Sequence, residues 1–352
     1  VDRQSDRIVV GAKRLATVKD DEDRHNYAYV FYGDTFFDTI KDPKWAGMGH
    51  EMIAFTHYYI VENGESFYLH AGESVPIEDF EVPRVRHNFK ETSDDKAAWD
   101  SLMNAIAEGI SSGEMTKVVS SREVEFSSDT PYNVASILAN LVDNNPNCFI
   151  FGYEKDGRTF VGASPEILVR HRGNEILSYA LAGTAPKHGP NAWTKEQLLT
   201  DNKNLFEHTI VRDRIVNTMK AITPDVTIGE TGIMELAHLY HLRTIITAKD
   251  STKSLVEWAK LLHPTPALGG EPREKALALL QTYEAHERGM YAAPFGFMKD
   301  MGDGIVVVAI RSALIMDNVL YAYAGCGVVA DSDADEEYAE TNNKMRTILD
   351  AL

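Results

Sequence analysis

The helix predicted near the C-terminus carries two glutamates and a lysine at a spacing that suits metal and anion binding. Glu337, Glu340 and Lys344 are three and four positions apart, so their side chains project from one helix face. The small and apolar residues of Ala324–Val329 precede this helix, and glycines there would let a ligand approach the backbone closely. Carboxylates beside a lysine suit a hard divalent cation with an anionic substrate. A solvated acidic helix surface is the alternative interpretation.

A third carboxylate could come from the helix predicted over residues 195–221. Glu207 lies there between apolar and aromatic neighbours, where an unpaired charge would be costly. A half-buried glutamate paired with Lys203, four residues earlier, is the simpler interpretation. In company with Glu337 and Glu340, however, Glu207 would supply the oxygen ligands that Mg²⁺ prefers.

Two further residues are of the types that transfer protons. Lys117 opens the apolar strand predicted over 117–126, and Glu166 precedes the apolar run Ile167–Val169. Burial in a cleft lowers the pKa of a lysine and raises that of a glutamate, which suits a general base and a general acid. A charged residue at a strand edge is also a common solvent-facing guard. The residues alone therefore leave both interpretations open.

The elements that must position these side chains predict an α+β fold with large antiparallel sheets. Strands arrive in groups and do not alternate with single helices. Two β-rich runs, 304–316 and 318–329, are expected to form one hairpin. Further strands are expected over 117–126, 147–153, 158–163, 166–171 and 175–182, and helices over 95–111, 195–221, 252–261, 271–287 and 334–350.

The first 90 residues are expected to be β-rich and to pack into the same fold as the catalytic region, 91–352. Runs 52–61 and 65–70, joined by Glu62-Asn63-Gly64, predict a hairpin. The polar run 85–96 is a candidate connector.

Composition limits the possible partners and compartment. The chain has 35 Lys and Arg against 53 Asp and Glu, a formal charge of −18, so nucleic acid is not an expected partner. No apolar run is long enough to span a bilayer, and the first residues carry no apolar leader. The cysteines, Cys148 and Cys326, have no metal or disulfide spacing, which favours a reducing, cytoplasmic location.

A series of motifs gives the sequence its most specific signal. In chain order they are KVVSSR (117–122), GASPEILVR (162–170), LAGTAP (181–186), NKNLFEH (202–208), HPTPALGGEPRE (263–274), ERGMYAAPFGF (287–297), AIRSA (309–313) and AGCGVVADSDADEEYAETNNK (324–344). With them the chain resembles the chorismate-utilising enzymes, namely isochorismate synthases, salicylate synthases and the synthase subunits of anthranilate and aminodeoxychorismate synthase. The resemblance begins near residue 95 and implies large antiparallel sheets that form a central sandwich surrounded by helices.

Three positions of this resemblance favour the isochorismate synthase branch. Aminating members usually have Gln where this chain has Lys117, because ammonia needs no base to activate it. Aminodeoxychorismate synthases often have Lys at the position of Ala182, and anthranilate and salicylate synthases usually begin the motif at His263 with Phe-Pro. Salicylate synthase is the alternative, and an inactive relative acting as a binding or regulatory subunit is a third hypothesis. Isochorismate serves menaquinone and siderophore synthesis, and the sequence leaves the pathway open.

The resemblance also implies roles for individual residues. Mg²⁺ would be held by Glu207 and Glu340, with Glu337 nearby through water. Lys117 would deprotonate a water that attacks C2 of chorismate, and Glu166 would protonate the departing C4 hydroxyl. The implied substrate-binding residues are Gly183, Thr184, His263, Tyr291, Arg311, Gly325 and Lys344. The enzyme would be a monomer or a weak homodimer without an obligatory amidotransferase subunit.

Two residues are interpreted more cautiously within this resemblance. Asn204 occupies a position where relatives often have Asp, so the loss of a carboxylate one turn from Glu207 predicts weaker metal affinity. His241 is interpreted as a structural histidine whose ring nitrogens are satisfied by hydrogen bonds.

Overall fold

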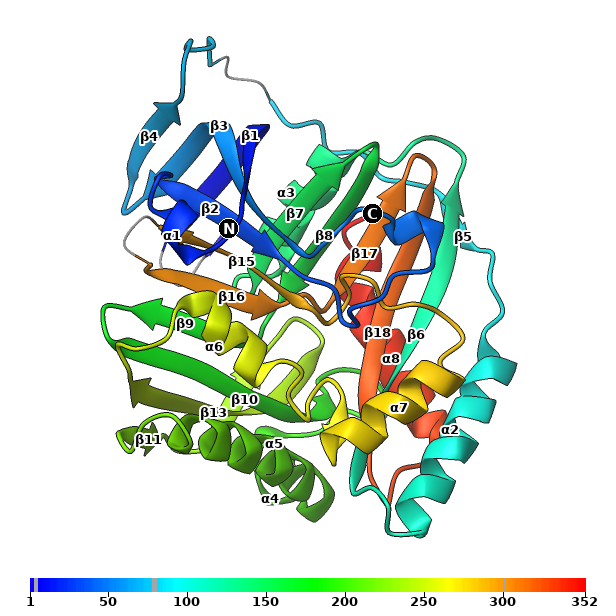
Figure 1. The fold of residues 1–352 in the computed structure, drawn as a ribbon. Coiled ribbons are helices and arrows are strands. Elements are labelled where there is room, and N and C mark those ends of the chain that lie inside the picture. Colours follow the sequence, from blue (N-terminus) through cyan, green and yellow to red (C-terminus); the bar gives the residue numbers. More distant parts are fainter. Residues whose placement is uncertain (3–5, 78–80, 300–301) are drawn as a thin grey trace.

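Two large antiparallel sheets dominate the fold. A computed structural model describes residues 1–2, 6–77, 81–299 and 302–352 of the chain. Within these ranges the strands form an 11-stranded and a 7-stranded sheet, which occupy the left and right halves of Figure 1. Helices cover their outer faces, so the predicted α+β class is confirmed.

The 11-stranded sheet combines strands from both ends of the chain. Alternate residues of β13 are buried from Leu242 onward, as expected for a strand with one face on the core. The order is β1 (Arg7–Val18), β3 (Glu51–Glu62), β2 (Tyr29–Gly33), β15 (Pro294–Lys299), β16 (Gly304–Val308), β9 (Ile167–Arg172), β10 (Glu175–Pro186), β13 (Leu239–Lys249) and β11 (Val226–Ile228), with β4 (Glu65–His70) on β3 and β12 (Gly232–Glu235) on β13. The predicted hairpin of 52–61 and 65–70 is confirmed as β3 and β4.

The 7-stranded sheet contains the strand that begins at Lys117. Its order is β14 (Gly270–Glu271), β6 (Lys117–Ser128), β18 (Val319–Val328), β17 (Ser312–Met316), β8 (Arg158–Ser164) and β7 (Phe149–Lys155), with β5 (Phe89–Glu91) on β6. The predicted strand over 304–316 is wrong, because 304–308 belongs to the other sheet as β16. The chain is interrupted at Arg311, whose φ of 53° is incompatible with a strand.

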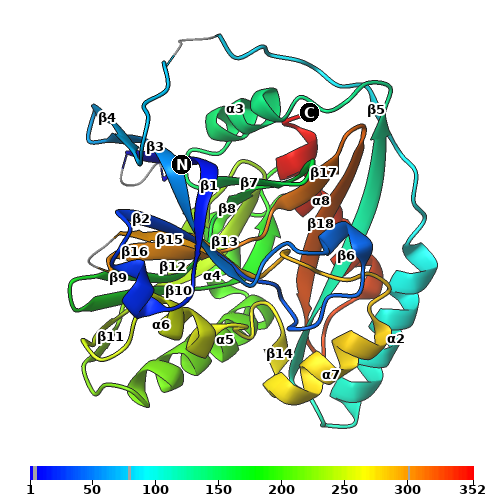
Figure 2. The same cartoon turned by 45° about the horizontal axis from the view of Figure 1, so that its top comes forward.

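Each helix covers a particular set of strands. α2 (Lys96–Ser111) and α7 (Arg273–Tyr283) pack on β6, α3 (Val134–Asn144) on β7 and β8, α4 (Lys195–Thr200) and α5 (Asn202–Lys220) on β10, α6 (Leu255–Leu262) on β9 and β16, and α8 (Ala334–Leu349) on β18. The short helices α1 (Asp21–Arg24) and η1 (Pro43–Trp45) lie in the N-terminal part. Figure 2 shows the C-terminus beside α3, where Asn140 Nδ2 donates to the carbonyl of Ala351 at 3.0 Å.

The helix predicted over 195–221 is in fact two helices. Asp201 adopts an extended conformation between α4 and α5, and its side chain accepts a hydrogen bond from the backbone N–H of Asn204 at 2.8 Å. This is an N-cap, which satisfies an orphan donor at the start of α5. The break orients the first turn of α5 independently of α4.

The N-terminal residues contribute to both sheets. β2 pairs with β15, and Trp45 is fully buried against the rings of Phe160 and Tyr323, with centroid distances of 5.4 and 5.8 Å. Phe160 and Tyr323 belong to the 7-stranded sheet. The division of the chain at residue 90 stays a prediction. No helix in the described ranges is long and apolar enough to cross a membrane.

The Trp45→Ala variant tests whether the N-terminal part folds with the rest. Removing this buried ring should lower the free energy of unfolding by about 3–5 kcal/mol, measured by urea denaturation with circular dichroism and fluorescence. Both signals should change in one transition. Leu15→Ala, at a side chain that is 48% exposed, is the control and should change stability by less than about 0.5 kcal/mol. Two separate transitions would contradict a single folding unit.

Candidate active site

The chain passes from one sheet to the other at two neighbouring points, and each point places a charged residue at the same cavity. Glu166 lies between β8 and β9, and Arg311 lies between β16 and β17. The two crossings are joined by backbone hydrogen bonds, from Val308 N to Glu166 O at 3.1 Å and from Ala163 N to Arg311 O at 3.0 Å. A left-handed backbone at Arg311 is unfavourable for a side chain of this size, and such strain is concentrated at functional sites.

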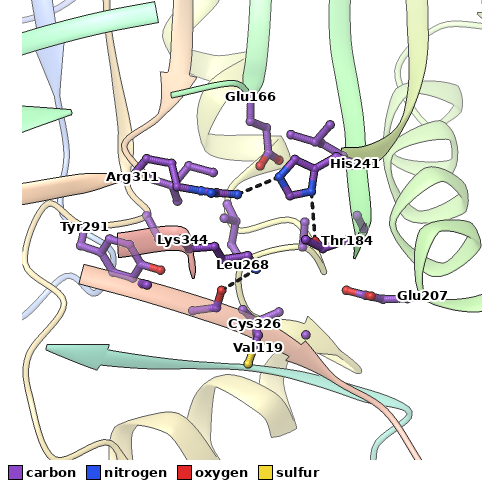
Figure 3. Close-up of a pocket in the computed structure, with 18 of the residues that line it drawn as sticks. Val119, Glu166, Thr184, Glu207, His241, Leu268, Tyr291, Arg311, Cys326 and Lys344 are labelled. Atoms are coloured by element: carbon purple, nitrogen blue, oxygen red, sulfur yellow. Dashed lines mark hydrogen bonds between the residues drawn. The ribbon is translucent and has the colours of Figure 1, made fainter. Parts of the chain in front are cut away.

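These crossings border a small cavity between the two sheets (Figure 3). Its volume is about 60 Å³, enough for a few water molecules. Of the predicted site residues, those in the wall are Glu166, Thr184, Glu207, Tyr291, Arg311, Gly325 and Lys344. Outside the wall are Lys117, Gly183, His263, Glu337 and Glu340.

Glu166 has the environment of a general acid. Its side chain is 2% exposed, and Oε1 has no hydrogen-bond partner. Burial raises its pKa from the usual 4.5 to about 8, although Lys117, Arg311 and Lys344 oppose the shift. At neutral pH the carboxyl group therefore holds a proton that it can donate into the cavity.

Lys117 lies behind Glu207, where it is completely buried. Its Nζ is 2.9 Å from Glu207 Oε1, as an ion pair without the geometry of a directed hydrogen bond. Gly327 of β18 makes this pair possible, because a Cβ there would lie 2.2 Å from Glu207 Oε1 and 2.8 Å from Lys117 Cε. The simpler pairing considered from the sequence, Glu207 with Lys203, is not formed.

A chain of hydrogen bonds links Arg311 to Thr184 through His241 (Figure 3). Arg311 NH2 lies 2.8 Å from His241 Nε2, and His241 Nδ1 lies 3.0 Å from Thr184 Oγ1. A guanidinium only donates, so Nε2 accepts and Nδ1 carries the hydrogen that is donated to Thr184. Burial, Arg311 and Lys344 hold the pKa of His241 well below its usual value. His241 is thus hydrogen-bonded at both nitrogens as expected, but it also lines the cavity, which the sequence did not indicate.

Lys344 and Tyr291 meet at the glycine-rich end of β18. Lys344 Nζ donates to Gly325 O at 2.8 Å and lies 2.6 Å from Glu340 Oε1. The ring of Tyr291 stacks on Tyr323 with centroids 5.4 Å apart. A Cβ on Gly325 would lie 2.9 Å from the Tyr291 hydroxyl, so a glycine is needed for this close approach.

Asn204 braces the turn at Gly183. Gly183 has a φ of +81° at an irregularity in the β10 register. The following N–H, of Thr184, donates to Asn204 Oδ1 at 2.8 Å, and Asn204 Nδ2 donates to Asp201 Oδ1 at 2.7 Å. An ionised Asp at position 204 could not donate to Asp201, so the asparagine matches its surroundings. The weaker metal affinity expected from Asn204 stays a prediction.

His263 lies away from the cavity wall. It is half-buried, with both ring nitrogens buried, and packs edge-on against Phe36, with centroids 5.4 Å apart. Burial lowers its pKa to about 3, so the ring is neutral at physiological pH.

Arg288 is a wall residue that the sequence analysis did not name. It is 1% exposed and donates to Leu268 O at 2.8 Å and to Val119 O at 2.7 Å. Its charge is balanced by Glu284, 2.5 Å away. Arg288 directly follows Glu287 and precedes the run 289–295, so its position in the sequence does not distinguish it from a surface charge.

The three predicted metal ligands are each neutralised by a lysine. Glu207 pairs with Lys117, Glu340 pairs with Lys344, and Lys203 Nζ lies 2.9 Å from Glu337 Oε1. Over the described ranges, no three His, Cys, Asp or Glu side chains are grouped closely enough to hold a metal. All three carboxylates nevertheless interact electrostatically with the same ammonium, that of Lys203. Carboxylate oxygens are also the ligands that Mg²⁺ prefers. The donor chemistry therefore fits this cation.

Comparison with known proteins agrees with the motifs. Residues 74–352 match the sequence family described as "Chorismate binding enzyme". The chain is 36% identical over 264 residues to isochorismate synthase MenF of Bacillus subtilis, and 33% identical over 268 residues to the salicylate biosynthesis isochorismate synthase of Pseudomonas aeruginosa. These alignments cover 73% and 74% of this chain but only 56% of each relative. The chain thus spans little more than half the length of these relatives.

A solved structure extends the likeness to the whole fold. The menaquinone-specific isochorismate synthase MenF of Escherichia coli superimposes with a TM-score of 0.80, covering 99% of this chain and 87% of that structure. The sequence identity is 24%, so this similarity speaks for the fold alone. The N-terminal strands, which carry none of the motifs, are included in the superposition.

The Glu166→Gln variant tests the protonation state of the buried acid. Because its pKa rises from 4.5 to about 8 on folding, the folded wild type keeps a proton that the unfolded chain releases. The wild type should therefore lose stability as the pH rises from about 5 to 8, whereas E166Q does not titrate. We expect the free energy of unfolding of E166Q to rise relative to that of the wild type by about 1.4 kcal/mol per pH unit in this window. The measurement is urea unfolding at a series of pH values. Identical pH dependence would mean an ionised Glu166.

Proposed function

The chain belongs to the chorismate-binding enzyme family, and we propose that within it the protein is an isochorismate synthase that uses Mg²⁺. The observation that carries the proposal is a buried acid in the cavity wall together with a buried lysine behind that wall. Glu166 carries a proton at neutral pH, and Lys117 lies behind the cavity wall at Glu207. Lys117 supports water as the nucleophile over ammonia, and therefore a protein that needs no amidotransferase subunit.

The proposed reaction exchanges one hydroxyl position for another. A water molecule adds to C2 of chorismate while the ring double bonds shift and the C4 hydroxyl departs. Lys117, as the free amine, accepts the proton of the attacking water, and Glu166 gives its proton to the departing hydroxyl, which leaves as water. Each proton transfer contributes roughly 10²–10⁴-fold in rate. The two protons balance, so no other reactant is needed.

The substrate's two carboxylates would be held by cationic groups of the wall. Arg311 is fixed by its hydrogen bond to His241, which leaves other guanidinium N–H groups to donate to a carboxylate. Lys344 already donates to Gly325 O, so its ammonium is held at the end of β18. Thr184 accepts from His241, which leaves its own hydroxyl hydrogen free to be donated to the substrate.

The metal ligands in this proposal are Glu207 and Glu340, with Glu337 nearby. When bound, Mg²⁺ would neutralise the ring carboxylate of chorismate and help to position the ring. The glutamates lie on two helices, α5 and α8, whose first two turns must hold them toward one another. The cytoplasm as location and a monomer or weak dimer as assembly stay predictions.

The proposal predicts that the protein converts chorismate to isochorismate only with Mg²⁺, reaching a plateau short of completion. Products are separated by chromatography. Lys117→Met and Glu166→Gln should each lower kcat by about 10²–10⁴-fold, because each removes a proton-transfer group. Lys195→Met, which removes a surface lysine paired with Glu235, is the control and should keep full activity.

Each alternative gives a different product in this assay. Salicylate together with pyruvate would assign the protein to the salicylate synthases. Unchanged chorismate, from folded protein supplied with Mg²⁺, would refute catalysis and favour an inactive relative.

Gly327→Ala should damage activity while the fold survives. The added methyl group would overlap Glu207 Oε1, a flexible side-chain end that can move, so the carboxylate should be pushed away from Lys117. We expect kcat to fall at least about tenfold, as for other displacements of positioned groups, with an unchanged circular dichroism spectrum. Gly232→Ala, where an added Cβ meets nothing within 4 Å, is the matched control. Full activity of G327A would show that the Lys117–Glu207 pair is unnecessary.

A further inference from the structure

Lys203 links the two helices that carry the carboxylates. It lies in the first turn of α5, and Glu337 lies in the first turn of α8. Lys203 Nζ is 2.9 Å from Glu337 Oε1, and the side chains of the two residues are 30% and 5% exposed, respectively. The ammonium thus reaches from the surface into a site where the carboxylate is almost completely buried.

All three carboxylates proposed as metal ligands contribute to the electrostatic environment of Lys203. Lys203 is in ion-pair contact with Glu337, and Glu340 and Glu207 also act electrostatically on its ammonium. Glu337 is almost completely buried, and Lys203 is the cation that contacts its carboxylate. One ammonium therefore offsets the repulsion between carboxylates that a divalent cation would otherwise neutralise.

The ammonium of Lys203 is held less tightly at the site than those of the other two lysines. Lys117 is completely buried, and Lys344 is also held by the carbonyl of Gly325. The Lys203 stem is partly exposed, and a long lysine side chain can turn its ammonium into water at little cost.

We propose that Lys203 is a built-in counter-cation of the carboxylate site, which neutralises Glu337 in the metal-free protein and withdraws when a divalent cation binds. The inference rests on the proposed function, which places the metal ligands at Glu207, Glu337 and Glu340. Lys203 then competes with the metal, so its charge lowers the metal affinity. A residue that only supported the ligands would have the opposite effect, since its loss would weaken binding.

The test is calorimetric titration of the full chain with Mg²⁺ and with Mn²⁺, without substrate. Lys203→Met keeps the apolar stem but removes the charge, and it should lower Kd by about tenfold, the coupling expected for opposite charges in close contact. Lys203→Arg keeps the charge and should bind within about threefold of wild type. Lys195→Met removes a lysine of α4 that pairs with Glu235, and it should leave Kd within about twofold. An unchanged or weaker Kd in K203M overturns the proposal.

A double variant separates pairing with Glu337 from a general effect of charge. In a Glu337→Gln background, Lys203→Met should lower Kd by no more than about threefold, because the main partner is already neutral and only Glu340 and Glu207 remain. An undiminished tenfold gain in that background would overturn the proposal in favour of a diffuse field. Wild type that binds no cation would overturn both this inference and the proposed metal site. Wild type that binds the cation and forms isochorismate, with no gain in K203M, would overturn the inference alone.

Discussion

The pairing of buried and half-buried charges around one cavity is the constraint on which the rest of the structure depends. Three glutamates and three lysines approach from β6, α5 and α8, and each forms an ion pair with one partner. Removing one member of such a pair leaves a buried charge uncompensated, which is strongly destabilising. Glu166 has no lysine partner of this kind and is instead neutralised by a proton. Catalytic capacity and stability are therefore consequences of one electrostatic arrangement.

The two sheets supply the frame for this arrangement. β6 and β18 of the smaller sheet hold Lys117 and Gly327, whereas β10 and β13 of the larger sheet hold Thr184 and His241. The crossings at Glu166 and Arg311 connect the two sheets. Both charged residues therefore lie between strands, at points where the chain leaves one sheet and enters the other. Helices α5 and α8 then border the site with Glu207 and Lys344, respectively.

Much of this could be predicted from residue patterns, and the remainder depends on contacts between distant segments. The periodicity of β3–β4, α2 and α8 is local, so those elements were predicted correctly. The break at Arg311 was not, because the apolar run 304–316 looks continuous until its halves pair with different sheets. Lys203 at four residues from Glu207 indicated a local pair, but tertiary packing gives each of them another partner. His241, Arg288 and Gly327 carry no chemical signature of their own, and their roles depend on neighbours that are far away in sequence.

The hydrogen bonds between the two crossings have a mechanical consequence. They join Val308 to Glu166 and Ala163 to Arg311, at the place where the two sheets meet. If the sheets rotate against each other to admit a ligand, this junction acts as the pivot and moves least. The proton donor and the guanidinium would then travel as one rigid unit, and the widening would occur at the far side, toward α5 and α8. The site could thus open without disturbing the spacing of Glu166 and Arg311.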